Sequence, residues 1–248
     1  MEFFPSEFKQ EVSSLITISD YFHHFINDEM IDEIVKCTNE RFSAQEQLLT
    51  KNELLGYFGL LLLFGVTKKH DIEISEIWNN ESVNHMDWAT VCMSRSRFSL
   101  ISRKICFDQF SIRSERSIID PKFYKMRTVF NMFKLNCEKG LIPGSNLCID
   151  EQLYSFRGRC AFKQYIPSKP AEYGIKFWAL VDCDSGYLLD TDVYLGKINF
   201  FKKKNVYFNT INYIKEKNFQ QIQTKKTQER MFACHSQKNM LFLIKNVA

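Results

Sequence analysis

The spacing of apolar residues changes near Gly140, and this change constrains the fold more than any other feature of the sequence. Before this position, apolar side chains recur every three or four residues, as they do on one face of a helix. Beyond it they alternate with polar side chains, as they do in a strand with one buried face. The sequence therefore predicts an α+β protein, in which a helical region over residues 1–145 precedes a sheet-forming region over residues 146–248.

One apolar run predicts the central helix of the first region. Thr50 and Glu53 match the capping-box pattern, in which each side chain binds a free backbone N–H of the first turn. Residues 54–66 follow directly and are almost entirely apolar. This run has thirteen residues, whereas a helix needs about 20 to cross a bilayer, so we predict a buried core helix and no membrane partner.

Two further helices are predicted from their end residues. Ser19 is placed to cap a short helix near the start of the chain. Asp120 followed by Pro121 is typical of a helix start, and Gly140 stands where a helix often closes in the left-handed conformation. We therefore predict a helix over residues 121–139.

Three segments of the second region have the period of strands. They are residues 146–156, 173–182 and 187–195, and the last two are joined by a Cys-Asp-Ser-Gly turn at residues 183–186. Short returns of this kind connect antiparallel neighbours, so the sequence predicts an antiparallel meander. Beyond Gly196 the apolar pattern decays into a basic tail.

The charge of the chain is unevenly distributed. Its net charge is +4, but residues 1–90 carry 6 basic and 16 acidic side chains, whereas residues 91–248 carry 27 and 13. A basic half of this kind favours a polyanionic partner. Hydrophobic residues make up 45% of the chain, which excludes a wholly disordered protein.

The eight cysteines give no sign of a structural metal site. They are scattered without a CxxC pair, and no histidine stands at the spacing of a zinc finger, so we predict reduced thiols and no zinc site. The acidic first residues lack the features of a signal peptide. These observations predict a protein of the cytosol or nucleus.

Asp150 is the most informative single residue. It lies in the middle of an otherwise apolar predicted strand, where an unpaired carboxylate would be costly to bury. A bound divalent metal ion is one way to compensate its charge. The alternative is that Asp150 lies on the solvated face of an edge strand, and the residues alone leave both interpretations open.

Basic and aromatic residues alternate directly after this strand. The aromatic residues are Phe156, Phe162, Tyr165 and Tyr173, and the basic ones are Arg157, Arg159, Lys163, Lys169 and Lys176. This mixture is suited to DNA, because cations bind phosphates and aromatic rings stack on bases. A solvated rim beside a core would have the same composition, so this alternative also remains open.

Several segments, taken in order, resemble piggyBac-type DNA transposases and the domesticated proteins derived from them. They are TNE at residues 38–40, SRSRFSLISRKICF at 94–107, IDEQLYSFRGR at 149–159, YIPSKP at 165–170, YGIK at 173–176 and GYLLDTDVYLGK at 186–197. The resemblance implies that residues 146–248 form a truncated ribonuclease H-like catalytic domain with a partial mixed sheet. Residues 1–145 would form a DNA-binding and dimerisation region.

The same resemblance implies a two-metal site. The family holds two Mg²⁺ ions with three aspartates, and Asp150 matches the first of them, which makes it the candidate catalytic residue and metal ligand. Asn205 stands nearest to the second position, where an amide would replace a charged ligand, and no acidic residue follows Glu229. The metal site is therefore expected to be incomplete.

Four other carboxylates follow in the predicted strands. Asp182 and Asp184 fall at the hairpin turn, where acidic residues are common. Asp190 and Asp192 share one face of the third strand, which we predict to be solvated. None of the four is therefore expected to complete the site.

These observations lead to one leading hypothesis and two alternatives. The leading hypothesis is a truncated transposase-derived protein of the nucleus that binds DNA, such as terminal inverted repeats or TTAA sites, but neither cuts nor joins it. A homodimer or a complex with a related transposase is expected on the same grounds. One alternative is an active or partly active Mg²⁺-dependent transposase or nuclease. The other is a non-functional relic of a transposon.

Overall fold

The computed structural model describes residues 5–69, 71–196 and 222–223. Within them the chain forms two compact units, which are described separately. One unit contains residues 5–27, 130–196 and 222–223, and the other contains the described residues between 28 and 129. The functional division at residue 145 stays a prediction.

The unit of residues 28–129 is built from helices. They are α3 (Asp28–Asn39), α4 (Lys51–Val66), α5 (Ile74–Ile77), α6 (Asp87–Cys92), α7 (Arg95–Lys104), the 3₁₀ helix η1 (Phe110–Ile112) and α8 (Arg113–Ile119). Helix α9 (Tyr124–Gly140) begins in this unit and ends in the other. None of the helices described for this chain combines the length and hydropathy that crossing a membrane requires.

Helix α4 supplies much of the core of this unit. Its capping box is formed as predicted, because Glu53 N donates to Thr50 Oγ1 at 3.2 Å and Thr50 N donates to Glu53 Oε2 at 3.1 Å. Tyr57 and Phe64 are buried, and their rings pack against Phe98 of α7 at centroid distances of 5.0 and 5.8 Å. These contacts confirm the predicted core helix, since they remove its aromatic surface from water.

The other unit contains the sheet. Its strands are β3 (Leu147–Ser155), β4 (Gln164–Tyr165), β5 (Tyr173–Asp182), β6 (Leu188–Val193) and β7 (Ile222–Gln223). Two short strands, β1 (Glu7–Phe8) and β2 (Leu141–Ile142), form a separate antiparallel pair. Helices α1 (Gln10–Ser13) and α2 (Ile18–Phe25) precede the sheet in the chain.

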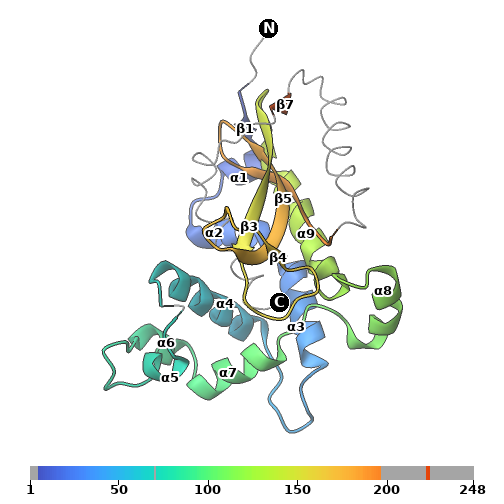
Figure 1. The fold of residues 1–248 in the computed structure, drawn as a ribbon. Coiled ribbons are helices and arrows are strands. Elements are labelled where there is room, and N and C mark those ends of the chain that lie inside the picture. Colours follow the sequence, from blue (N-terminus) through green and yellow to red (C-terminus); the bar gives the residue numbers. More distant parts are fainter. Residues whose placement is uncertain (1–4, 70, 197–221, 224–248) are drawn as a thin grey trace. The chain divides into compact units, whose positions relative to one another are not determined.

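Strand β5 lies between β3 and β6 and is antiparallel to both, and β3 and β5 run side by side in Figure 1. Strand β4 pairs with the start of β5, and β7 runs parallel to β3. The predicted meander is confirmed, and the parallel β7 makes the sheet mixed. The predicted α+β class is confirmed as well, since helices fill the first half of the chain and the sheet follows them.

Aromatic contacts show which face of the sheet is covered. Tyr154 and Phe177 are on the same face, with ring centroids 5.3 Å apart, and Phe130 of α9 lies 6.1 Å from Phe177. One turn further along α9, Phe133 lies 6.3 Å from Phe25 of α2. Helix α9 therefore covers this face, and α2 packs on α9.

Gly140 has a different role from the predicted one. It is the last residue of α9, but it does not adopt the left-handed conformation that Gly186 and Gly196 adopt. Glycine is required here for space, since a Cβ would lie 2.1 Å from Tyr187 Oη and 2.9 Å from His24 Nε2. The predicted left-handed cap is therefore wrong, because contacts with distant residues decide this position.

The starts of two predicted helices also differ. Thr17, rather than Ser19, caps α2, because Thr17 forms the reciprocal capping box of this helix. Helix α9 begins at Tyr124, since the residues directly after Asp120 form a turn. Within this turn Phe123 N donates to Asp120 Oδ1 at 3.3 Å, so the predicted cap holds the turn that precedes the helix.

The hairpin between β5 and β6 forms where it was predicted. Gly186 has a φ of 71°, a conformation that suits glycine. Asp182 Oδ2 accepts a hydrogen bond from Ser185 N at 2.8 Å, and its Oδ1 accepts one from Gly144 N at 3.0 Å. The predicted role of Asp182 in the turn is confirmed.

Candidate functional site

Asp150 lies on β3, which lies between β5 and β7 in the described sheet. Strand β3 pairs with β5 along its whole length, whereas β7 pairs only with Leu147 and Cys148. At Asp150 the described strands therefore cover one edge of β3, and the alternative of a solvated edge stays a prediction. The side chain is half-buried, and its Oδ1 accepts a hydrogen bond from Glu151 N at 2.7 Å. Among the described residues, no ion pair involves Asp150.

Across the described strands β3, β5 and β6, the row of residues that contains Asp150 has no second carboxylate. Asp150 is paired with Ala179 on β5, and Ala179 is paired with Thr191 on β6. Because paired residues point to the same face, the nearest side chains in this row are a methyl group and a hydroxyl. The hydroxyl of Thr191 donates to Trp178 O at 3.0 Å. This row therefore brings Asp150 no further charged oxygen.

The described residues do not fit a two-magnesium site. No three His, Cys, Asp or Glu side chains among them are grouped so that they could hold a metal ion. Asp190 was predicted to be solvated, but it is buried and lies 3.0 Å from Lys134 Nζ, which compensates its charge. Burial raises the pKa of Asp190, an effect that Lys134 opposes. Asn205 lies outside the described residues.

Glu151, on the opposite face of β3, gathers two of the predicted DNA-binding cations. Lys176 Nζ forms an ion pair with Glu151 Oε2, and Lys169 Nζ lies 3.7 Å from Oε1 of the same carboxylate. Lys176 also lies over the rings of Trp178 and Tyr194, at 4.5 and 5.4 Å from their centroids. Burial alone would raise the pKa of Glu151, but the two ammonium groups hold it below its ordinary value. Lys169 and Lys176 are therefore compensated within the protein.

The three other predicted DNA-binding residues lie in the loop between β3 and β4. Arg157 and Arg159 are exposed, and Lys163 is half-buried. Lys163 Nζ donates to Gly158 O at 3.1 Å, and a Cβ at Gly158 would lie 2.5 Å from Cζ of Phe156. The segment that carries both arginines is thus bound to Lys163 by one hydrogen bond and has no room for a side chain at Gly158, and its role in DNA binding stays a prediction.

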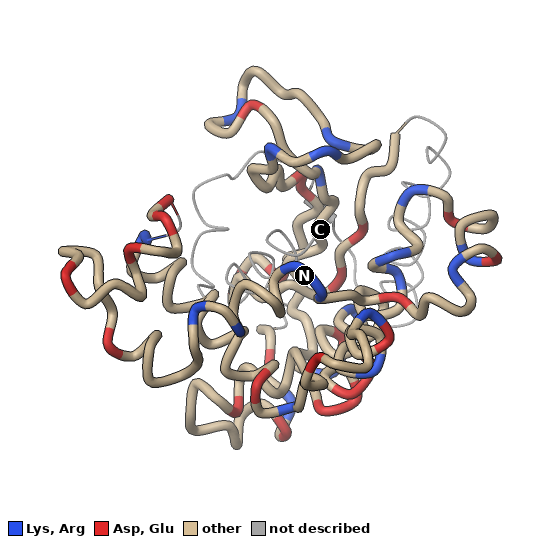
Figure 2. The backbone as a smooth tube through the Cα atoms, turned by 90° about the horizontal axis from the view of Figure 1, so that it is seen from below, with Lys and Arg blue, Asp and Glu red and all other residues tan. Residues whose placement is uncertain are grey.

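The distribution of charge along the described backbone does not by itself locate a DNA-binding surface. Basic and acidic residues are interspersed along the described backbone (Figure 2), so an interface has to be argued from individual side chains. The predicted basic tail lies outside the described residues, apart from 222–223.

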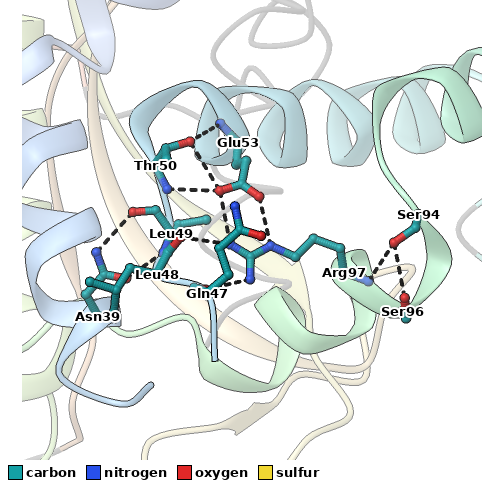
Figure 3. Close-up of polar contacts among 9 residues, drawn as sticks. All are labelled: Asn39, Gln47, Leu48, Leu49, Thr50, Glu53, Ser94, Ser96 and Arg97. Atoms are coloured by element: carbon teal, nitrogen blue, oxygen red, sulfur yellow. Dashed lines mark hydrogen bonds and ion pairs between the residues drawn. The ribbon is translucent and has the colours of Figure 1, made fainter. Parts of the chain in front are cut away.

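In the helical unit, Arg97 holds the segment that precedes α4 (Figure 3). Its Nη1 donates to Gln47 O at 2.8 Å, and its Nη2 donates to Leu48 O at 3.0 Å. Its Nε donates to Glu53 Oε1 at 2.8 Å. The motif at residues 94–107 indicated a family but not this role, because the contacts join residues 44 to 50 positions apart.

Comparison with known proteins assigns the family. The family described as Transposase IS4 matches residues 17–234. Human PiggyBac transposable element-derived protein 3 is 28% identical over 178 residues, which are 70% of this chain and 28% of that protein. In a cryo-EM structure of a piggyBac transposase synaptic complex with hairpin DNA, one chain matches with 30% identity and a TM-score of 0.70, over 79% of this chain and 42% of that chain.

The helical first half, the sheet that follows it and the strand with Asp150 are thus those of a transposase fold. This chain belongs to the Transposase IS4 family. Within that family it is a piggyBac-type, transposase-derived protein, which confirms the resemblance of its sequence motifs. The chain spans less than half the length of each of these two relatives.

Proposed function

We propose that this chain binds DNA through the loop between β3 and β4 and neither cuts nor joins it. Two observations support DNA binding. The structurally similar transposase was solved as a synaptic complex with hairpin DNA, and Arg157 and Arg159 are exposed on a loop in which Lys163 binds the carbonyl of Gly158 between them. Exposed arginines bind phosphate oxygens through charge and paired hydrogen bonds.

Among the described residues, no group of three carboxylate, thiol or imidazole side chains could hold a metal ion at Asp150, and this observation carries the second half of the proposal. Phosphoryl transfer by two metal ions needs several charged oxygen ligands that converge on the same ions. Ala179 and Thr191 stand beside Asp150 in its row, and the sequence offers Asn205 where the resemblance expects the second aspartate. A neutral amide compensates two dications poorly, so Mg²⁺ is expected to bind weakly.

The wider expectations from the sequence belong to the same proposal. The DNA would be a transposon end or a TTAA site, and the chain would act in the nucleus. A second copy of the chain or a related transposase would be a further partner.

A gel-shift titration tests the DNA-binding half. The chain is titrated into a short duplex that contains TTAA, at about 50 mM and about 200 mM salt. We expect the affinity to fall steeply as salt rises, since phosphate contacts release counterions. An affinity that does not change with salt would argue against an interface made by the two arginines.

A cleavage assay tests the catalytic half. The chain and Asp150→Ala are incubated with hairpin DNA and with the TTAA duplex in Mg²⁺, and no cut or joined product is expected from either. Products that appear with the natural chain and vanish with Asp150→Ala would overturn the proposal and favour the active transposase. A chain that binds no DNA and unfolds without cooperativity would instead favour the relic.

A further inference from the structure

Two tyrosines form an exposed aromatic pair at the end of the sheet beside the arginine loop. Tyr165 of β4 and Tyr173 of β5 are paired across the two strands. Their ring centroids are 4.7 Å apart, and the ring planes are tilted by 34°. Both residues are more than half exposed, at 55% and 52%. Each ring therefore contacts the other and still leaves aromatic surface open to solvent.

Cations lie beside this pair. Lys163 Nζ is 5.8 Å from the centroid of Tyr173, and the same ammonium group donates to Gly158 O at 3.1 Å. Gly158 stands between Arg157 and Arg159, so one lysine connects the aromatic pair with the segment that carries both exposed arginines. One carboxylate, that of Glu172, neighbours Tyr173 in the sequence, and the three cations outnumber it.

This combination matches the chemistry of unpaired nucleotides. Every nucleobase has an aromatic face that stacks on tyrosine, whereas the bases of a duplex are covered by their neighbours. Cations near the stacking surface hold the phosphates that link the bases. A solvated strand end needs neither two open rings nor a cation over one of them, so a stacking ligand explains features that the fold alone does not require.

We propose that Tyr165 and Tyr173 form a stacking platform for unpaired bases of single-stranded DNA, and that Arg157, Arg159 and Lys163 hold the backbone of that strand. The proposal rests on the proposed DNA binding and specifies the form of DNA that this end of the sheet recognises. It predicts that the rings contribute to single-strand binding through their aromatic faces and not through their hydroxyl groups.

Matched substitutions separate stacking from packing. Tyr165→Leu with Tyr173→Leu keeps two apolar side chains in the cross-strand pair but removes both aromatic faces. Tyr165→Phe with Tyr173→Phe keeps the faces and removes the hydroxyl groups. Thermal unfolding of both variants first shows whether the fold is retained.

Fluorescence anisotropy then measures binding of labelled oligothymidine and of a labelled duplex. We expect the double Leu variant to bind the oligothymidine at least about fivefold more weakly, the lower end of the effect of losing one stacked base. Its affinity for the duplex should change less than about twofold, and its salt dependence should stay the same, because no cation is lost. The double Phe variant should bind like the natural chain.

A second measurement detects the stacked base directly. An oligothymidine with one 2-aminopurine should lose fluorescence on binding to the natural chain and to the Phe variant, but not to the Leu variant. The platform is disproved if the Leu variant binds and quenches like the natural chain, or if duplex and single strand weaken equally. A chain that binds neither form of DNA refutes the proposed function itself, whereas unchanged duplex binding with no effect of the tyrosines refutes only the platform.

Discussion

Arg97 of α7 and Glu53 of α4 form a two-bond ion pair, with Arg97 Nε 2.8 Å from Glu53 Oε1 and Nη2 3.0 Å from Oε2 (Figure 3). The same carboxylate accepts a hydrogen bond from Thr50 N and so completes the capping box of α4. Burial opposes the charge of Glu53, but Arg97 and Thr50 hold its pKa below the ordinary value. The carboxylate of Glu53 thus caps the start of α4 and also links α4 to α7 through Arg97.

Substitution of Arg97 should show how much the ion pair between Arg97 and Glu53 contributes to stability. Arg97→Ala removes the bonds to Glu53 and to two backbone carbonyls, so we expect the free energy of unfolding to fall by about 2–3 kcal/mol. Arg97→Lys should recover less than half of the stability that Arg97→Ala loses, because one ammonium cannot reproduce the guanidinium fork. Urea unfolding measures the free energy of unfolding of both variants. Arg95→Ala is the matched control, since Arg95 is exposed on the same helix and should cost less than about 0.5 kcal/mol. Equal losses for the two arginines would contradict this assignment.

Two glycines in helices should respond to alanine in opposite directions. Gly140→Ala places a Cβ against Tyr187 Oη, and we expect a loss of about 1–3 kcal/mol in the free energy of unfolding. Gly59→Ala in α4 meets nothing within 4 Å, so the better helix propensity of alanine should stabilise the protein by up to about 1 kcal/mol.

A second substitution checks the cause of the Gly140 effect. Tyr187→Phe removes the closest atom, so Gly140→Ala should cost less in that background than in the natural chain. Thermal and urea unfolding of the natural chain, of the two single variants and of the double variant supply the comparison. A cost that is the same with and without the hydroxyl would show that crowding at Tyr187 is not the reason.

The stability of the sheet-containing unit should depend on pH through His24. Its Nε2 is buried and has no hydrogen-bond partner among the described residues. Burial lowers the pKa of His24 below 6.5, while nearby Glu11 opposes the shift and Lys139 adds to it. The unfolded chain therefore takes up this proton at a higher pH than the folded chain does.

Stability that His24 contributes is thus present above its unfolded pKa and is lost as the pH falls below 6.5 toward its folded pKa. We expect the midpoint of thermal unfolding to drop between about pH 7.5 and about pH 5, and to drop less in His24→Gln. Melting curves across this range provide the measurement. If the variant shows the same pH dependence as the natural chain, another group is responsible.

The two exposed arginines should set the salt dependence of DNA binding. Arg157→Gln with Arg159→Gln removes two proposed phosphate contacts, so the slope of log affinity against log salt should decrease by about 1.8 for a duplex. Lys36→Gln is the control, since Lys36 is an exposed cation of α3 in the acidic part of the chain and should leave the slope nearly unchanged. Gel shifts at several salt concentrations measure the slopes of both variants. Similar slopes for the double arginine variant and for Lys36→Gln would show that the loop with Arg157 and Arg159 does not contact the DNA phosphates.

Local patterns predicted the two longest helices, α4 and α9, and the three longest strands, β3, β5 and β6. Strand β5 begins and ends where its alternation begins and ends, and the capping box at Thr50 marks the start of α4. Both signals depend on neighbouring residues alone, so the sequence contains all the information they need. The errors at Ser19 and at residue 121 are shifts of two or three positions at helix ends, where several residues compete for the same cap.

The candidate site was less predictable. The sequence singled out Asp150 and the cations that follow its strand, but it treated all five cations alike. The structure separates them, because Lys169 and Lys176 are held by Glu151 whereas Arg157 and Arg159 are exposed. Composition cannot separate paired cations from exposed ones, since charge compensation depends on which residues the folded chain brings together.

The sequence by itself determined the order of helices and strands, the turn at Gly186 and the transposase family, because periodicity, turn chemistry and ordered motifs are local properties of the chain. Only the tertiary structure decided why residue 140 is a glycine, where Asp190 finds its counter-charge and which cations stay exposed. In each case the deciding partner is distant in the sequence, as Tyr187, Lys134 and Glu151 are. Steric contact and charge compensation act through space, so only the folded chain contains that information.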